Sequence, residues 1–479
     1  MPSPPTAARR LPTAALSRRA LLHGAIGAGL LASLPAGPAL AAPAPALPPT
    51  GAAPYVPALP PKAGANLQQS IRALSAPPDP NRPFLIWALG SSYANALGSG
   101  RDLIALLRAK RPALPRVVWR QDVGSGVPYQ YLQGFAEGGL IPTNPDLVVV
   151  YAPGEPADLD ALLGRLRATT SADLVVPTLH WRLEDQALWG NSEDGTEVKA
   201  AELRAVAKAH GAELLEHRAE WARYLRENNL PLEALLKDKS HQTPYGAWML
   251  QALLAAHLER PAAASAPLRS SHQALNQVLK PGEHVILKAE GQRFDLVVAP
   301  GTGQLQIQVD GRSAAEHPAL LQGPTERGAN NARPSDRVTR DIGPHGLVLE
   351  RPGALKPERI DVEVIDGQGN FTVTGSERGR LGQGRSTEGF ATADGALRLP
   401  AQWWRRPAMA TQGDRYSVQL ERAVTERAST AVDAGAPRHT PKSVELRLAT
   451  LLPAGAHTLR IEALDAPVTL RGLWSHRFG

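Results

Sequence analysis

The chain has 479 residues, a length that predicts two or three domains. Hydrophobic residues make up 43% of it and charged residues 20%, a composition that excludes a disordered or collagen-like protein. It contains 0 cysteines, which excludes disulfides, thiol catalysis and zinc–thiolate sites. The formal charge of +7 includes the arginines of the first 41 residues, and no concentrated block of Lys and Arg follows, which argues against nucleic acid as a partner.

Residues 1–41 have the pattern of an export signal. The pair Arg18-Arg19 precedes an apolar stretch that ends in Ala39-Leu40-Ala41. Paired arginines before leucines are typical of twin-arginine signals, and an A-x-A site indicates cleavage after Ala41. A generic secretory signal is the alternative. We therefore expect an exported, periplasmic or extracellular protein that is not integral to a membrane once the signal is removed.

Residues 42–80 are predicted to be a linker. The stretch 42–64 is rich in Ala and Pro, a composition that favours neither a helix nor a buried core. We expect it to be a tether or a poorly ordered lead-in.

Strand and helix patterns alternate from residue 81 to residue 262. The expected strands are short apolar or β-branched runs: Phe84–Leu89, Val117–Trp119, Leu147–Ala152, Leu174–Pro177 and Glu213–Glu216. Helical spacing marks Asp102–Lys110, Leu159–Ala168, Val198–His210, Ala219–Asn228 and Tyr245–Glu259. Such alternation predicts a doubly wound α/β domain, with a parallel sheet covered by helices on both faces.

After about Pro261 the pattern changes to short strands bounded by Gly, Pro and Asp. The candidates are His284–Lys288, Phe294–Val298, Gln304–Val309, Ile360–Ile365, Phe371–Val373, Tyr416–Leu420, Val444–Leu448, Thr458–Ile461 and Val468–Leu473. They predict an all-β sandwich region. Because a Gly- and Arg-rich stretch covers residues 376–387, we expect two β domains, 263–385 and 386–479.

Two loops of the predicted parallel sheet carry residues suited to nucleophilic catalysis. The loop after the first strand reads Gly90-Ser91-Ser92, and a serine there can present its hydroxyl at the edge where ligands bind. Asp238 and His241 precede the last helix. Histidine can take the proton of a serine, and a carboxylate can fix the histidine tautomer. Each loop alone is also explained by turn and capping chemistry.

Taken together, a serine after the first strand and D-x-x-H before the last helix resemble the SGNH/GDSL hydrolases over residues 81–259. The resemblance implies a flavodoxin-like fold with Ser92 as nucleophile and Asp238 and His241 completing the triad. It also implies that the backbone N–H of Gly124 helps to bind the oxyanion.

The chain departs from the family pattern at two blocks. Ser91 stands where the family's G-D-S has aspartate, and the G-x-N-D block is missing after Pro145-Asp146-Leu147-Val148, since the chain continues as Gly154-Glu155-Pro156-Ala157. The lost asparagine is an oxyanion donor in the family. Asn95 and Asn144 are the candidate substitutes.

Other residues near the expected strand ends are candidates for substrate binding. His180 and Trp181 follow the fourth strand and are predicted to line a pocket, with a structural role as the alternative. Trp403-Trp404-Arg405-Arg406 is a candidate sugar platform, in which strand alternation would expose one tryptophan. The histidines show no H-E-x-x-H spacing and there is no phosphate-binding loop, so we expect neither a metal nor a cofactor.

These observations predict a secreted serine esterase that removes acetyl or other short acyl groups from acylated carbohydrate. The carbohydrate rests on analogy with other exported esterases that carry β modules. The alternatives are a non-catalytic carbohydrate-binding or surface protein on the same scaffold, and an O-acyltransferase.

Overall fold

The computed structural model describes residues 46–124, 126–188, 195–261, 268–317, 320–327, 344, 346–351, 355–404 and 407–479. The expected export signal, residues 1–41, lies outside these ranges. All of the described residues belong to one unit of the chain. None of the helices in these ranges has the length and apolar character that a membrane crossing requires.

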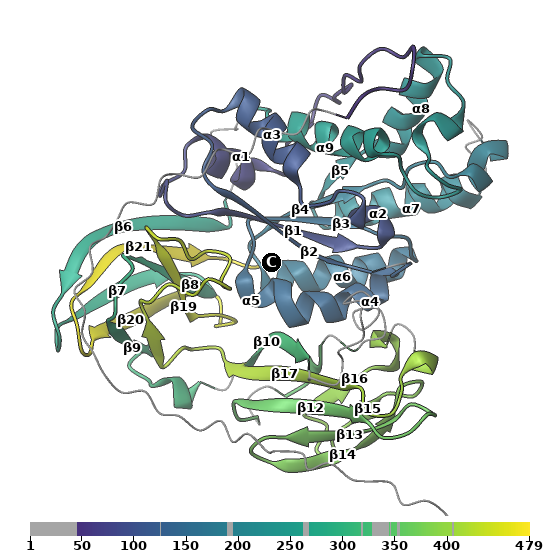
Figure 1. Cartoon of the computed structure of the whole chain (residues 1–479). Coiled ribbons are helices and arrows are strands. Elements are labelled where there is room, and N and C mark those ends of the chain that lie inside the picture. Colours follow the sequence, from purple (N-terminus) through teal and green to yellow (C-terminus); the bar gives the residue numbers. More distant parts are fainter. Residues whose placement is uncertain are drawn as a thin grey trace, which may run out of the picture. The chain divides into compact units, whose positions relative to one another are not determined.

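Five parallel strands form the first sheet, in the order β2-β1-β3-β4-β5 (Figure 1). They are β1 (Phe84–Gly90), β2 (Val117–Val123), β3 (Leu147–Tyr151), β4 (Asp173–Pro177) and β5 (Glu213–Leu215). Every residue of β1, β3 and β4 is buried, which explains why these segments are unbroken apolar runs. The predicted α/β fold is confirmed, and this strand order is the flavodoxin-like one.

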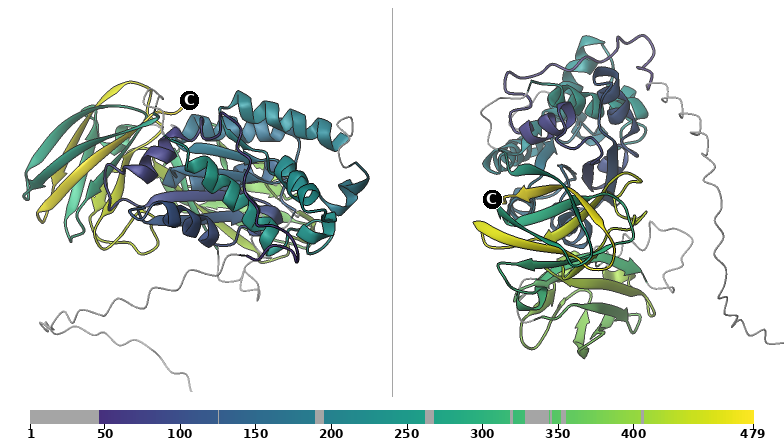
Figure 2. Two further views of the ribbon diagram at one scale, coloured as in Figure 1. Left: turned by 90° about the horizontal axis from the view of Figure 1, so that it is seen from above. Right: turned by 90° about the vertical axis from the view of Figure 1, so that its left-hand side faces the viewer.

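Helices cover both faces of this sheet because side chains alternate along each strand. Leu85 and Trp87 of β1 face one core, and Phe84 and Ile86 face the other. The first core is closed by α4 (Tyr129–Phe135), α6 (Pro156–Thr169) and α7 (Gly195–Ala209), and the second by α1 (Gln68–Ser75), α3 (Arg101–Lys110) and α9 (Pro244–Leu258) (Figures 1 and 2). The other α-helices in the described ranges are α2 (Ser92–Asn95), α5 (Ile141–Thr143) and α8 (His217–Glu227).

The segment that precedes α1 is a strap on the α/β fold, not a tether. Tyr55 is buried, its hydroxyl donates to Glu220 Oε2 (2.7 Å), and its backbone N–H donates to the Tyr245 hydroxyl (2.7 Å). The expectation of a poorly ordered lead-in is therefore wrong for its described part. A Pro-rich chain needs no core of its own when it packs against α8 and α9.

Two four-stranded antiparallel sheets, β18-β9-β20-β7 and β19-β8-β21-β6, enclose a second core, which confirms the predicted β-sandwich. Their strands are β6 (Ser270–Leu279), β7 (His284–Glu290), β8 (Arg293–Val298), β9 (Gln304–Val309), β18 (Arg427–Ser429), β19 (Val444–Ala449), β20 (Ala456–Ala463) and β21 (Val468–His476). The sandwich is thus built from the first and the last strands of the β region.

A further β unit is inserted between β9 and β18. It has one five-stranded sheet, β10-β17-β12-β13-β14, and one three-stranded sheet, β11-β16-β15, around a common core. The strands are β10 (Leu320–Arg327), β11 (Val348–Leu349), β12 (Glu358–Val364), β13 (Asn370–Gly375), β14 (Gly379–Arg385), β15 (Phe390–Ala391), β16 (Leu397–Leu399) and β17 (Arg415–Arg422). The expected division into 263–385 and 386–479 does not follow this pairing, because β8 pairs with β19 and β21 across the insert.

Both tryptophans of the expected sugar platform are buried. Trp404 stacks on Phe371 of β13 with ring centroids 5.1 Å apart, and Trp403 is equally covered. The segment Ala401–Trp403 is a 3-10 turn, so the alternation of a strand does not apply to it. This pair offers no exposed ring face, and Arg405 and Arg406 lie outside the described residues.

A buried cluster of four charges ties the amino-terminal edge of the parallel sheet to the sandwich. Asp146, just before β3, contacts Arg82 (2.9 Å) and Arg438 (3.0 Å). Glu445 of β19 pairs with the same two arginines. The alternation of acid and base lets four charged side chains share a site that water hardly reaches.

Candidate functional site

Ser92 lies at the carboxyl edge of the parallel sheet, where the strand order reverses between β1 and β3. Ligands of open α/β sheets bind at this switch point. Ser92 is the first residue of α2, and Ser91 caps this helix by accepting the N–H of Tyr93 (3.2 Å). The N–H of Ser91 donates to the carbonyl of Tyr151 at the end of β3 (3.2 Å), so the loop is held against both strands.

Gly90 makes this turn possible by leaving out a side chain. A Cβ there would lie 2.2 Å from the carbonyl oxygen of Tyr151 and 2.5 Å from the Cβ of Ala94. We expect Gly90→Ala to lower the free energy of unfolding by about 1–3 kcal/mol, because the strand or the helix must shift. Urea denaturation measures the effect. Gly367, where an added Cβ meets nothing within 4 Å, is the matched control, and equal losses in the two variants would contradict the prediction.

Asp238 and His241 sit on a tight loop before α9. Asp238 Oδ1 accepts the backbone N–H of Ser240 (2.9 Å) and of His241 (2.8 Å), while the N–H of Lys237 donates to the carbonyl of His241 (2.9 Å). Thr243 then caps α9 by accepting the N–H of Gly246 (3.1 Å). The three-residue spacing of D-x-x-H is what allows one turn to carry both side chains.

The structure brings Ser92, His241 and Asp238 into one hydrogen-bonded line. His241 Nδ1 lies 2.9 Å from each carboxylate oxygen of Asp238, and His241 Nε2 lies 2.9 Å from Ser92 Oγ. The backbone N–H of Ser240, assisted by His241, holds the pKa of Asp238 at about 2. An ionised carboxylate only accepts, so Nδ1 carries the proton of the neutral ring and Nε2 accepts from the Ser92 hydroxyl.

Two of the three residues expected to bind the oxyanion, Gly124 and Asn144, are not available for it in this structure. The N–H of Gly124 donates to the carbonyl of Gly90 (3.1 Å), so the expectation for Gly124 is not met in this structure. Asn144 precedes β3 at the opposite edge of the sheet and is buried on Ser171. Asn95 is exposed on α2, three residues after Ser92.

His180 and Trp181 are inside the α/β fold and do not line a substrate pocket. His180 is 0% exposed, with both ring nitrogens engaged. Trp181 donates its indole N–H to the carbonyl of Arg218 (3.1 Å), and the Arg218 guanidinium covers its ring at 3.4 Å. The structural alternative therefore describes both residues better.

A cavity of about 220 Å³ opens at the ends of β4 and β5, and Gly154, from the loop after β3, is part of its lining. Arg182 lines it too, and sequence reasoning missed this residue. Its guanidinium is paired with Asp185 (3.0 Å) and with Glu184, and it lies beside Tyr93. The Tyr93 ring packs on the His241 ring with centroids 5.9 Å apart. The available signal was its position in the same strand-exit loop as His180.

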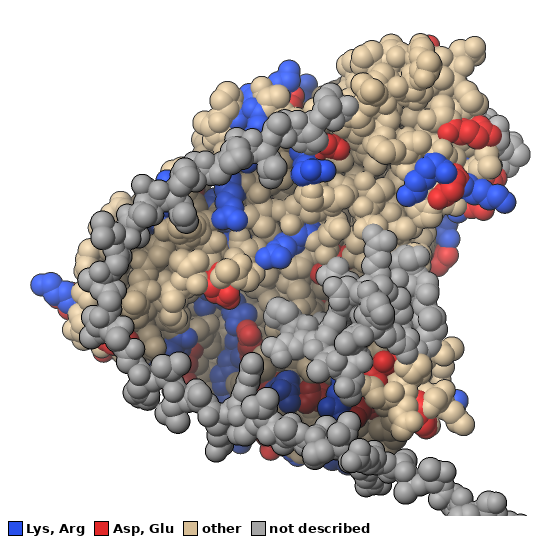
Figure 3. All heavy atoms as spheres, in the orientation of Figure 1, with Lys and Arg blue, Asp and Glu red and all other residues tan. Residues whose placement is uncertain are grey.

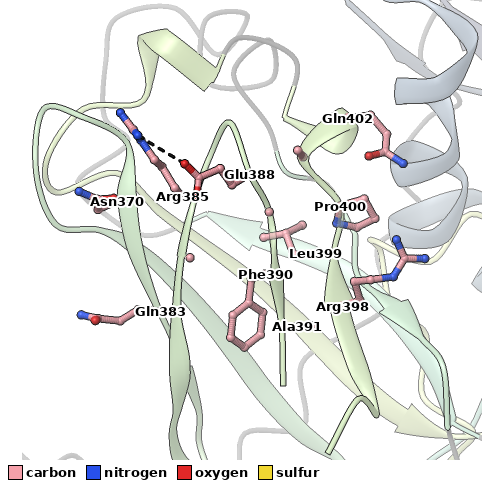
Figure 4. A pocket seen from close by; sticks show the side chains of 13 residues that line it. Asn370, Gln383, Arg385, Glu388, Phe390, Ala391, Arg398, Leu399, Pro400 and Gln402 are labelled. Carbon is pink, nitrogen blue, oxygen red and sulfur yellow. Dashed lines mark hydrogen bonds and ion pairs between the residues drawn. The ribbon is translucent and has the colours of Figure 1, made fainter. Parts of the chain in front are cut away.

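The inserted β unit has an open groove of about 640 Å³, lined by Phe390, Gln383, Arg398 and Gln402 among others. Figure 4 shows that Gln383 and Arg398 point away from each other, and that Arg385 is paired with Glu388 instead of being turned toward them. On the face shown in Figure 3, basic side chains lie among acidic ones. Nowhere in the described ranges do three or more His, Asp or Glu side chains gather as a metal ion would require.

No family model and no curated protein matches this chain. It is similar to a solved α/β hydrolase from the metagenome of Lake Arreo, Spain, with 19% identity and a TM-score of 0.31 over 36% of this chain and 94% of that one. It is also similar to an acetylxylan esterase from Geobacillus stearothermophilus, with 16% identity and a TM-score of 0.31 over 38% of this chain and 97% of that one. A third similar structure is a two-domain esterase active on acetylated mannans, with 10% identity and a TM-score of 0.29 over 83% of this chain and 91% of that one. Likenesses at this level do not show the SGNH/GDSL family and carry no argument about function.

Proposed function

We propose that this chain is a serine ester hydrolase in which Ser92 is the nucleophile, His241 the general base and Asp238 the group that orients the base. The observation that carries the proposal is the unbroken line of 2.9 Å contacts from Asp238 through the His241 ring to Ser92 Oγ. A serine hydroxyl becomes a useful nucleophile only when a positioned base takes its proton.

The reaction would proceed through an acyl-enzyme. Ser92 Oγ attacks the ester carbonyl as its proton passes to His241 Nε2, and the ionised Asp238 stabilises the imidazolium. The tetrahedral intermediate collapses when His241 protonates the departing alkoxide. Water then enters, gives a proton to His241 and attacks the acyl-enzyme, which releases the acid and restores Ser92.

The oxyanion would be held by the N–H of Ser92 and by the side-chain amide of Asn95. The first residue of a helix has an N–H with no partner inside the helix, and residues three apart share a helix face. Together they would stand in for the asparagine that the family pattern has after the third strand.

The exposure of the triad supports an acylated polymer as substrate and water as acceptor. The side chain of Asp238 is 50% exposed and that of His241 is 32% exposed. An open edge can receive an ester that projects from a long glycan chain, and it does not exclude water as an acyltransferase must. We therefore propose acetyl or other short acyl groups on a polysaccharide.

Two measurements on the full chain test this proposal. The protein should release acetate from a short-chain aryl acetate, and a fluorophosphonate should form one covalent adduct that peptide mass spectrometry maps to Ser92. Release of acetyl groups from acetylated xylan or mannan would then identify the polymer. A chain that neither hydrolyses these esters nor reacts with the fluorophosphonate is not a serine hydrolase, and the carbohydrate-binding alternative would replace the proposal.

A further inference from the structure

A buried histidine bridges the parallel sheet and the loop that carries two members of the proposed triad. His180 lies after β4, and its Nε2 is 2.7 Å from the carbonyl oxygen of Ser240. Its Nδ1 is 2.6 Å from the hydroxyl of Tyr151, the last residue of β3. Ser240 stands directly before His241, so this contact acts next to the proposed base.

The direction of each hydrogen bond follows from the chemistry of the groups. A carbonyl only accepts, so His180 Nε2 carries the proton and Nδ1 accepts from the Tyr151 hydroxyl. The same hydroxyl accepts the side-chain N–H of Gln242 (3.1 Å). Burial lowers the pKa of His180 to about 4, which agrees with a neutral ring. A chain of three hydrogen bonds therefore runs from Gln242 through Tyr151 and His180 to Ser240. Gln242 and Ser240 are the two sequence neighbours of His241.

Aromatic contacts prevent the His180 ring from turning. Trp221 stacks on it with centroids 4.9 Å apart, and Tyr93 meets it edge-on at 4.8 Å. Tyr93 also packs against the His241 ring at 5.9 Å. The His180 ring therefore holds the backbone of Ser240, on one side of His241. Its partner Tyr151 holds the side chain of Gln242, on the other side. These two contacts restrict the position of His241.

We propose that His180, with Tyr151, is a positioning residue that sets the distance between His241 Nε2 and Ser92 Oγ by holding the carbonyl of Ser240. The proposal rests on the esterase function proposed above. Small displacements of catalytic groups matter because a shift of about 1 Å can lower a rate by about 100-fold. The mode of action differs from that of the triad, since His180 itself is out of reach of substrate.

The test compares His180→Phe with His217→Phe in the full chain. Both rings are buried in the same aromatic cluster, and both contact Trp221. Within the described part of the chain, the ring nitrogens of His217 have no hydrogen-bond partner. Replacing His180 should lower kcat for aryl acetate by about 10–100-fold with KM changed less than about twofold. His217→Phe should leave kcat within about twofold, because it removes no hydrogen bond.

Two further variants separate positioning from a general loss of packing. His180→Gln can still donate to Ser240 and should recover part of kcat, while Tyr151→Phe, which removes one oxygen, should lower kcat without unfolding the chain. Amide hydrogen exchange of residues 238–243 should be faster in His180→Phe than in His217→Phe. Equal kcat and equal exchange in those two variants, with an active wild-type protein, would overturn this inference alone. An inactive wild-type protein would instead count against the esterase proposal.

Discussion

Replacement of Ser92 by alanine is expected to lower the rate of aryl acetate hydrolysis by about 10⁴-fold or more. The reason is that Ser92 Oγ is the proposed nucleophile and lies 2.9 Å from His241 Nε2. The stability of the fold should be nearly unchanged, since the substitution removes one hydrogen bond at a partly exposed position. Initial rates and thermal unfolding of wild type and variant measure the two effects.

Ser91→Ala is the matched control for this prediction. Ser91 is the neighbouring serine, but its Oγ caps α2 instead of contacting the His241 ring. Its loss should cost about 1 kcal/mol of stability, as expected for a lost helix cap, and should leave hydrolysis within about tenfold of wild type. If Ser92→Ala kept wild-type activity, or if Ser91→Ala abolished it instead, the assignment of the nucleophile would be wrong.

The state of Asp238 also predicts one feature of the dependence of activity on pH. Because the pKa of Asp238 is lowered to about 2, this carboxylate stays ionised throughout the mildly acidic range. Protonation of Asp238 should therefore contribute no loss of activity between about pH 4 and pH 7, and a pH–rate profile of the wild-type protein measures this.

Replacement of Asp146 by alanine is expected to lower the free energy of unfolding by about 3–5 kcal/mol. The carboxylate contacts Arg82 and Arg438, and it accepts the N–H of Leu85 (2.7 Å). Its removal would leave two buried guanidinium groups that share the single carboxylate of Glu445 within this cluster. Urea denaturation at neutral pH measures the loss. Glu363→Ala, which removes an exposed pair with Arg415, is the control and should cost less than about 1 kcal/mol.

This cluster also predicts the response of the protein to acid. Burial alone would raise the pKa of Asp146, but Arg438 and Arg82 outweigh it and hold the value at about 2. Since the folded-state pKa lies below the unfolded value of about 3.9, the contribution of Asp146 is present above about pH 4. It should disappear as pH falls from about 4 to about 2, and Asp146→Asn should lack this component. An equal pH dependence in wild type and Asp146→Asn would exclude the cluster as its source.

Sequence reasoning located the parallel sheet and the candidate triad because both depend on local patterns. The apolar run Phe84–Leu89 falls within β1 (Phe84–Gly90), and the helical spacing of Tyr245–Glu259 matches α9 to within one residue at each end. Ser92 and Asp238 could be named in advance because the carboxyl ends of parallel strands meet at one edge. Their catalytic roles stay proposals.

Other features were decided only by contacts between distant segments. The sandwich pairs β8 with β21, and Tyr55 finds Glu220 across 165 residues of sequence. No periodicity within a segment encodes such a partner. Contacts between distant segments likewise decide that the Gly124 N–H donates to the carbonyl of Gly90 and that both tryptophans after β16 are buried.

The amino-acid sequence by itself therefore determined the five strands of the parallel sheet and five of the helices that cover it, although it did not reveal α1 or α4. It also singled out Ser92, Asp238 and His241 as candidate site residues. The tertiary structure decided how the β strands pair around an insert, which candidate side chains are buried, and how His180 comes to hold the loop of His241. The physical reason is that periodicity reports which face of an element is apolar. Pairing and hydrogen-bond partners instead depend on where the chain returns in space.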